Sequence, residues 1–299
     1  MSPEPSSSTI LRKKSEFLQA IRSFMQGKDI LEVITNPIMS HRVPDAGVDA
    51  LKIETVAQGV SFLHTSPEWE MKRLLCQGSG DIYYLGTVFR DDLNARWHKP
   101  AFTMLEWYRV GFDDRALIEE CVSFLGTLGF KQPVFYHDIP DLYQDICGMN
   151  IHQASISGLE QYCIQEQIVF DGLVNSDQIN GWLDLIWVNK VEPTFSSGIH
   201  VVSKFPVEQA ALAKIAESPY PHAQRFEIYI DGCEVANGYH ELTEEGLEDR
   251  FTELLKTTKI KKSQVVSFDD IKCLPDCSGV SFGIDRLFAL RHDCLSLEV

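Results

Sequence analysis

Apolar residues in the first part of the chain recur with helical and then with strand-like spacing. Residues 11–26, LRKKSEFLQAIRSFMQ, predict a helix with one apolar face, and Gly27 supplies a stop signal. The next apolar run, ILEVITNPIM at 30–39, predicts a strand that Pro37 ends or bends, because proline lacks the amide hydrogen that a ladder needs. The apolar face of the helix consists of Phe17, Ile21, Phe24 and Met25.

Helix and strand patterns follow again between residues 61 and 129. TSPEWEMKRLLCQGSGDIYYLGTVFR predicts a short helix, a Gly-Ser-Gly turn and an apolar strand. FTMLEWYRVGF predicts another strand, and RALIEECVSFLGTLG predicts a helix. Residues 131–192 mix short amphipathic helices with loops.

The C-terminal third predicts a hairpin, a helix, and a strand that runs into a last helix. Apolar and polar residues alternate in RFEIYI, and Asp231-Gly232 behind them is a favoured two-residue turn. Thr243 can cap the helix that follows, and SGVSFGIDRLFAL is a glycine-bearing strand leading into a helix. The apolar stripe of the capped helix is Leu247, Phe251, Leu254 and Leu255.

Helices and strands are mixed along the chain without regular strand–helix–strand alternation. This order predicts an α+β fold with an antiparallel sheet flanked by helices. No internal repeat or low-complexity linker follows residue 10. We therefore expect a mobile, Pro- and Ser-rich tail at residues 1–10 and a single domain at 11–299.

Composition and charge narrow the possible functions. Of the 299 residues 44% are hydrophobic, enough for a packed core, but no apolar run is long enough for a membrane helix. A net charge of −16 argues against sequence-independent nucleic-acid binding, although a local basic site for a small anion stays open. Cys273 and Cys277 alone do not supply four zinc ligands. Reduced thiols and the lack of a signal peptide predict a cytoplasmic protein.

The segment FRDDLNARWHKPAFTMLEWYR, residues 89–109, mixes arginines, acids and aromatics beyond what folding requires. It predicts a long-looped hairpin, and strand alternation places Phe102, Met104, Glu106 and Tyr108 on one face. Arginine matches phosphate oxygens, an aromatic ring can stack on a nucleobase, and a carboxylate beside a tyrosine can hold an ammonium group. A salt-bridged surface hairpin would explain the same spacing.

Two later segments also carry candidate chemistry. Glu234 and Glu241 flank VANGYH, and two carboxylates near a phosphate are a usual way to hold magnesium, although a solvated acidic loop has the same pattern. In GVSFGIDR the glycines mark a bulge or a close approach to the backbone. Arg286 opens the next helix and could reach a nucleotide over those glycines.

Taken in order, these segments resemble the three signature motifs of class II aminoacyl-tRNA synthetases. ILEVITNP resembles motif 1, whose proline, here Pro37, lies at the dimer interface in that family. FRDD…AFTMLEWYR resembles motif 2, and GVSFGIDR resembles motif 3. TSPEWEMKRLL, FTMLEWYR and EVANGYHEL are similar to the lysine branch. The resemblance covers about residues 11–290 and implies a class II catalytic core that forms a homodimer.

Motif 1 begins almost at the start of the chain, so no room is expected for the anticodon-binding barrel of a lysyl-tRNA synthetase. A stand-alone core with LPDCSGV at 274–280 resembles the elongation factor P–lysine ligases. The resemblance implies that a lysine isomer, (R)-β-lysine, is activated with ATP and Mg²⁺. It is then transferred to a lysine ε-amine of elongation factor P, and tRNA is not expected as a partner.

The resemblance also implies roles for individual residues. Arg90, Arg286 and Glu241 would be catalytic, with Arg90 on the α-phosphate of ATP. Phe102 would stack on adenine, with Arg286 on its other face. Glu234 and Glu241 would hold magnesium or order the substrate amine. The implied ATP-binding residues are Arg90, Asp91, Asp92, Lys99, Phe102, Glu234, Val235, Gly283 and Arg286. The implied substrate-binding residues, with Glu106 and Tyr108 on an amino group, are Ser66, Pro67, Glu68, Glu106, Tyr108, Asn237, Gly238, Glu241 and Ser281.

Three places depart from the family pattern. FRNE becomes FRDD with Asp92, HNPEF becomes HKPAF with Lys99 and Ala101, and Ser281 replaces the alanine usual in the ligases. Three alternatives stay open: a degenerate paralogue that binds a nucleotide or aminoacyl-adenylate as a regulator, an ammonia-dependent amide synthetase, and a tRNA aminoacylator without its anticodon domain. The substrate isomer, the acceptor lysine and the proton acceptor of the transfer step also stay open.

Overall fold

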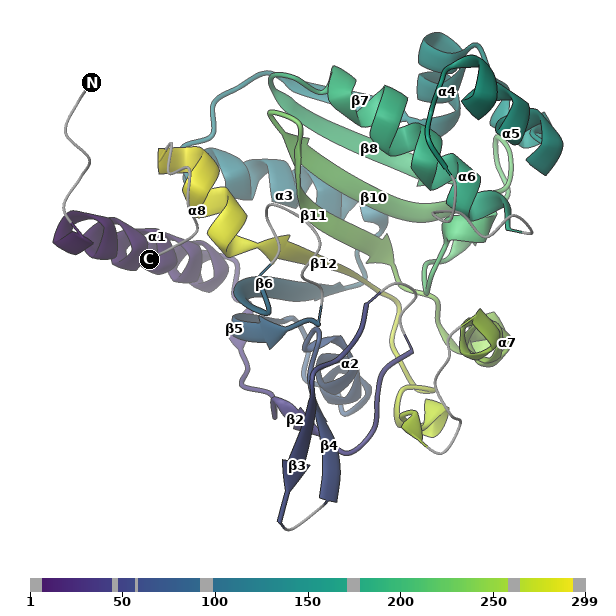
Figure 1. Cartoon of the computed structure of the whole chain (residues 1–299). Helices are drawn as coiled ribbons and strands as arrows, with labels where there is room; N and C mark the ends of the chain where they lie inside the picture. The colour runs from purple at the N-terminus through teal and green to yellow at the C-terminus, as the bar shows by residue number, and fades with distance from the viewer. Residues whose placement is uncertain are drawn as a thin grey trace. The chain divides into compact units, whose positions relative to one another are not determined.

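Figure 1 shows the computed structural model, which describes residues 7–44, 48–56, 59–91, 99–170, 178–257 and 264–292. The chain divides into two compact units. The first contains residues 1–131 and 235–299, and the second contains residues 132–234. The prediction that residues 11–299 form one domain stays a prediction.

The main sheet of the first unit carries its strands in the order β1-β5-β6-β12-β11. β1 pairs with β5 in parallel, and the other neighbours pair antiparallel, so the predicted α+β class is confirmed with a mixed sheet. The strands are β1 (Leu31–Glu32), β5 (Ile82–Phe89), β6 (Ala101–Val110), β12 (Cys277–Gly283) and β11 (Cys233–His240). A small antiparallel sheet consists of β2 (Ile38–Met39), β4 (Gly59–Leu63) and β3 (Lys52–Thr55).

The helices of the first unit largely follow the predicted apolar patterns. Helix α1 begins at Ser7, so residues 7–10, which were expected in the tail, are helical, because Ile10 continues the apolar face seven residues before Phe17. Helix α3 starts where the Asp113 carboxylate accepts a hydrogen bond from Ala116 N at 2.8 Å. The helices are α1 (Ser7–Gly27), α2 (Glu68–Cys76), α3 (Asp114–Thr127), α7 (Glu244–Thr257), the 3₁₀ turn η6 (Phe268–Asp270) and α8 (Ile284–His292).

The strand predicted at 30–39, which Pro37 was expected to end or bend, is shorter than expected, because the chain leaves the main sheet after Glu32 and bends at Pro37. β1 ends at Glu32, and the side chain of Asn36 accepts a hydrogen bond from Ile38 N at 3.0 Å, which stabilises a turn around Pro37. Ile38 then pairs with Leu63 in the small sheet instead of continuing along the main sheet.

The second unit contains strands at 134–138, 199–205 and 215–216 that the sequence patterns missed. β7 (Val134–Asp138) pairs in parallel with β8 (Ile199–Phe205), which pairs antiparallel with β10 (His222–Ile230), and β9 (Ile215–Ala216) pairs with β10. The predicted turn at Asp231-Gly232 is confirmed by positive φ angles of 49° and 78°. The helical elements are α4 (Ile139–Cys147), η1 (Ile151–Gln153), α5 (Ile156–Gln165), α6 (Ile179–Ile186), η2 (Trp187–Val191), η3 (Glu192–Thr194) and η4 (Val207–Gln209).

An aromatic core holds β6 and β12 together from one face of the first unit's main sheet. The rings of Trp107 and Phe282 stack with their centroids 5.4 Å apart, and Phe124 of α3 packs edge-on against both. All three side chains are buried, and truncating such an aromatic residue typically costs about 3–5 kcal/mol. This packing fixes β6, whose Glu106 and Tyr108 alternate to the opposite face as predicted. Among the described helices of both units, none is long and apolar enough to cross a membrane.

Candidate active site

Four of the nine predicted amino-acid-binding residues, Glu106, Tyr108, Asn237 and Ser281, lie on one face of the first unit's main sheet. Glu106 of β6 stands in register between Tyr84 of β5 and Ser281 of β12, and Asn237 of β11 stands next to Ser281. Directly opposed residues in neighbouring strands share a face. The adjacent row contains Ile82, Tyr108, Gly279 and Tyr239, and the row on the other side contains Gly86, Met104 and Gly283.

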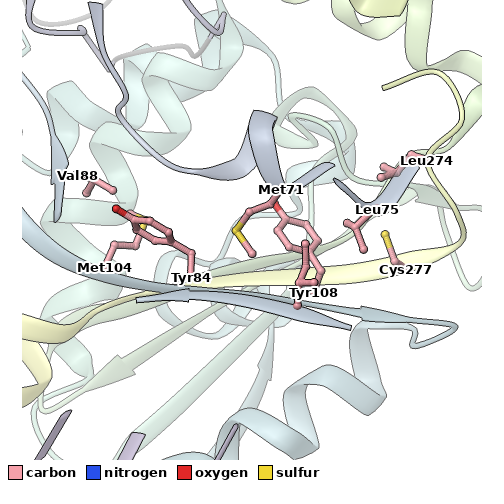
Figure 2. Close-up of a cluster of buried hydrophobic side chains, with 9 residues drawn as sticks. Met71, Leu75, Tyr84, Val88, Met104, Tyr108, Leu274 and Cys277 are labelled. Carbon is pink, nitrogen blue, oxygen red and sulfur yellow. The ribbon is translucent and has the colours of Figure 1, made fainter. Parts of the chain in front are cut away.

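Helix α2 covers the Tyr108 end of this face. Figure 2 shows Met71 and Leu75 of α2 over Tyr84, Met104 and Tyr108 of the sheet. All five are buried and form one apolar cluster with Val88, Leu274 and Cys277. The apolar floor surrounds the polar groups described next and lowers the local dielectric.

A buried polar cluster joins the start of α2 to β6. The Ser66 hydroxyl donates to Glu106 Oε2 at 2.7 Å and accepts from Glu68 N at 3.0 Å, so one side chain both turns the chain into α2 and orients Glu106. The Tyr108 hydroxyl donates to Glu106 Oε1 at 2.8 Å. Lys72 and Glu241 complete this group. We call it the Lys72 cluster, and it consists of Ser66, Glu68, Lys72, Glu106, Tyr108 and Glu241.

Lys72 links the two remaining carboxylates of the Lys72 cluster. Its ammonium lies 2.5 Å from Glu68 Oε1 and 2.7 Å from Glu241 Oε2. The side chains of Lys72 and Glu241 are each 1% exposed, whereas Glu68 is 26% exposed. Glu241 is anchored at the end of β11 by a hydrogen bond from its N to Cys277 O at 2.9 Å. Buried Oε2 of Glu241 has an ion-pair partner but no well-aligned hydrogen bond within the described residues.

Burial and like charge make the Lys72 cluster receptive to a cation. Burial, and then the charge of Glu68, raises the pKa of Glu106 to about 8. Burial also raises the pKa of Glu241 to about 7, against the attraction of Lys72. Burial by itself would lower the pKa of Lys72, but its two carboxylate neighbours raise it, so Lys72 stays charged. A positively charged ligand would therefore shift Glu106 and Glu241 toward their ionised forms.

The raised pKa of Glu106 predicts a pH-dependent stability. An unperturbed glutamate loses its proton near pH 4.5, but folded Glu106 keeps it to about pH 8, so the folded protein binds more protons between these values. Stability contributed by Glu106 therefore falls as the pH rises through this window. We expect Glu106→Gln, which cannot ionise, to gain stability relative to wild type between pH 6 and pH 9.

Denaturant unfolding at several pH values measures this difference in unfolding free energy. A difference between Glu106→Gln and wild type that stays constant from pH 6 to pH 9 would contradict the raised pKa of Glu106.

The predicted ATP-side residues lie at the other end of the same strands. The Arg90 guanidinium lies over the Phe102 ring at 5.2 Å, and its Nε donates to Thr65 O at 3.3 Å. Asp285 accepts a hydrogen bond from Thr103 N at 2.7 Å, which ties the start of α8 to β6. Phe102 and Arg286 neighbour Thr103 and Asp285 in the chain. They therefore lie on two segments that this hydrogen bond joins.

Several predicted site residues are placed differently or cannot be placed. Gly238 pairs with Val280, which pairs with Trp107, so its row faces the aromatic core and only its backbone can contribute to the site. Asp91 is exposed and donates its N–H to Asp49 O, while Lys99 is half-buried; Asp92 lies outside the described residues. Glu234 is the last residue of the second unit. Pro67 precedes α2, and buried Val235 lies in β11.

The predicted magnesium role of Glu241 fits this geometry poorly. Oε2 of Glu241 is already paired with the Lys72 ammonium, whose positive charge repels a second cation at that oxygen. The second predicted role of Glu241, ordering the substrate amine, agrees better with its place in the Lys72 cluster.

Comparison with known proteins places this chain in a family. The family model of tRNA synthetases class II (D, K and N) matches residues 2–294. The chain belongs to this family. This class II chain is 36% identical over 301 residues to the "Elongation factor P--(R)-beta-lysine ligase" of Vibrio parahaemolyticus, an alignment that covers 95% of this chain and 92% of the relative.

Other relatives carry the same name. The protein from Vibrio cholerae is 36% identical over 94% of this class II chain and 90% of its own length. The protein from Haemophilus ducreyi is 33% identical over 96% of this chain and 91% of its own length. The resemblance predicted from the sequence motifs is thereby confirmed at the level of the family.

Lys72 is the member of this class II site that sequence reasoning missed. A local signal was present, because Lys72 follows Glu68 by four residues in TSPEWEMKRLL, the spacing of a helical ion pair. An i,i+4 pair normally lies on a solvated helix face, and here the pattern is the same although the lysine is buried.

Proposed function

We propose that this protein activates a lysine isomer, (R)-β-lysine, with ATP and joins it to the ε-amine of a lysine in elongation factor P. Membership of the class II family and the name shared by the relatives support the proposal. The observation that carries it is buried Glu106, oriented by Ser66 and Tyr108 and accompanied by Glu68 and Glu241. A surplus of buried carboxylates suits ammonium groups, and it disfavours a substrate with a second carboxylate or an amide side chain.

Two balanced steps make up the proposed reaction. A carboxylate oxygen of the amino acid attacks the α-phosphorus of ATP, the bond to the bridging oxygen of the β-phosphate breaks, and pyrophosphate leaves. Arg90 and Arg286 would stabilise the charge that develops on the α-phosphate. The acceptor amine then attacks the carbonyl carbon of the adenylate, AMP leaves and an amide forms. The amine proton passes to Glu241 or to the adenylate phosphate.

Magnesium would serve this reaction mainly by neutralising the phosphates of ATP, because Mg²⁺ is held by substrate phosphates with one or two carboxylates. Glu234 stays a predicted ligand, and Glu241 is assigned instead to the Lys72 cluster. The recognition of the substrate amine follows from this chain's own residues without the metal.

The test is an exchange of pyrophosphate into ATP with purified protein and α-lysine, (R)-β-lysine or (S)-β-lysine. We expect exchange that depends on the amino acid and is fastest with (R)-β-lysine. When purified elongation factor P is added to the reaction, its intact mass should increase by the mass of one lysyl residue. Without ATP its mass should stay unchanged. Nucleotide binding without exchange for any isomer would favour the regulator instead.

We further propose that the protein is a cytoplasmic homodimer that contacts its partner through the segment around Pro37. Leu31 is 59% exposed, Ile34 is 94% exposed and Ile38 is 38% exposed, and neighbouring apolar side chains of this kind mark interaction surfaces. Ile34→Asp should shift the sedimentation of the protein from dimer toward monomer.

Val56→Asp is the matched control for this substitution. Val56 is equally exposed but lies at the β3–β4 end of the small sheet, outside the motif 1 segment. If sedimentation shows the same fraction of dimer for Ile34→Asp as for Val56→Asp, the proposed interface is refuted.

A further inference from the structure

Lys72 is buried at a cost that packing does not explain. It projects from the inner side of α2, close to Met71 and Leu75, which are both apolar and buried. Removing a charged pair from water is expensive, and apolar residues of similar size often stabilise such a position equally well. A lysine retained among apolar neighbours, with its ammonium between Glu68 and Glu241, therefore calls for a role beyond stability.

The charges of the Lys72 cluster indicate that role. Glu68, Glu106 and Glu241 supply three negative charges when ionised, and Lys72 supplies one positive charge. Ser66 and Tyr108 donate hydrogen bonds without adding charge. The ionised cluster thus carries two negative charges that its own members do not balance. A lysine isomer presents two ammonium groups, so the surplus matches it.

We propose that Lys72 is a positioning residue for the amino-acid substrate. Its ammonium holds Glu68 and Glu241 in place and favours the ionised form of Glu241, and it limits the surplus of the ionised cluster to two negative charges. Without Lys72 the same carboxylates would repel one another. They would then bind protons instead of the ammonium groups of the substrate. This inference rests on the proposed function, because it takes the substrate to be a diamino acid.

The groups that face Lys72 or its carboxylate partners come from several elements. They are Glu68 and Cys76 of α2, Tyr84 of β5, Glu106 and Tyr108 of β6, and Glu241 at the end of β11. Burial raises the pKa of Glu241 to about 7 and the pKa of Glu106 to about 8. The acid limb of kcat/KM for the amino acid reports groups of the free enzyme and so should reflect them.

The experiment compares Lys72→Met, Lys72→Arg and the control Arg73→Met in pyrophosphate exchange from pH 6 to pH 9. Arg73 is the next residue of α2 but forms a surface ion pair with Glu70 and is 42% exposed. Lys72→Met should raise the amino-acid KM at least about tenfold while the ATP KM changes little. The acid limb of kcat/KM for the amino acid should shift to higher pH by about one unit in Lys72→Met, because Glu241 loses its positively charged neighbour.

Lys72→Arg keeps the charge in a larger group, so it should retain the wild-type acid limb despite a raised amino-acid KM. Arg73→Met should behave like wild type. A Lys72→Met enzyme with the wild-type acid limb, or a Lys72→Arg enzyme whose limb moves equally far, would overturn the inference. If Lys72→Met does not fold, Lys72→Arg still tests the inference. A charge role predicts that its acid limb stays at the wild-type pH, and a purely structural role predicts that the limb moves.

A measurement without substrate separates this inference from the proposed function. Unfolding temperatures of wild type and Lys72→Met are followed from pH 6 to pH 9. The temperature for Lys72→Met should fall more steeply with rising pH, since its carboxylates must ionise without a cation. Parallel curves would refute the charge role of Lys72 even if exchange is observed. If wild type shows no pyrophosphate exchange but the two unfolding curves diverge with pH, only the proposed function is refuted.

Discussion

Replacing Arg90 with alanine should reduce pyrophosphate exchange by at least about 10³-fold, because an arginine on a phosphoryl group in transfer contributes about 10³–10⁵ in rate. Arg90 ends the β5 side of the hairpin, and its guanidinium lies over Phe102 at 5.2 Å. A phosphate placed beside an adenine on that ring would meet the guanidinium. Initial rates with saturating ATP and (R)-β-lysine measure the loss.

The fold should tolerate the Arg90→Ala substitution. The Arg90 side chain is half-buried, and its hydrogen bond to Thr65 O is long at 3.3 Å. The expected loss of unfolding free energy is therefore about 1 kcal/mol. Arg90→Lys should fall between wild type and alanine, since lysine keeps the charge without the bidentate fork.

Arg22→Ala is the control for general loss of a surface charge. Arg22 forms an exposed ion pair with Glu32 at 3.2 Å on the same unit. Exchange by Arg90→Ala at the rate of Arg22→Ala would remove Arg90 from the catalytic residues.

Replacing Gly279 with alanine should lower kcat/KM for the amino acid by at least about 10²-fold, the usual effect of displacing substrate-positioning groups by about an ångström. A Cβ at Gly279 would lie 2.3 Å from Cε1 of Tyr108 and 2.9 Å from Oε1 of Glu241. Both side chains are buried and cannot move aside freely. Moving Tyr108 also breaks its hydrogen bond to Glu106, so the new methyl group disturbs three members of the Lys72 cluster.

The loss should appear in the amino-acid KM, while the ATP KM stays within about twofold, because Gly279 lies in the row of Tyr108 and away from Phe102. Overpacking should also reduce the unfolding free energy by about 1–3 kcal/mol.

Gly126→Ala is the matched glycine control. A Cβ at Gly126 in α3 would meet nothing within 4 Å, and alanine favours a helix over glycine by about 1 kcal/mol. This variant should keep full activity and gain stability. Equal amino-acid KM values for Gly279→Ala and wild type would refute the tight packing of Tyr108 and Glu241 around position 279.

Much of the fold follows from local patterns. Period-two alternation placed Glu106 and Tyr108 on the face of β6 opposite Trp107, and the structure agrees. Asp231-Gly232 predicted its turn because both residues tolerate positive φ. The strand predicted to end or bend at Pro37 is divided between two sheets, because the sheet that Ile38 joins depends on Leu63, a partner that is distant in the sequence. β7 was missed because a short edge strand carries little pattern of its own.

The sequence by itself determined the class of the protein and the residue types of its site. Its motifs, in order, carry Arg90, Phe102, Glu106 and Arg286, and alternation along one strand is a local property that the sequence displays. Only the tertiary structure decided that Ser66 bonds to Glu106, that Lys72 joins Glu68 to Glu241, and that Gly279 leaves room for Tyr108. Burial, proton affinity and ion pairing depend on which distant segments share a desolvated space, and this is set by packing instead of by neighbours in the chain.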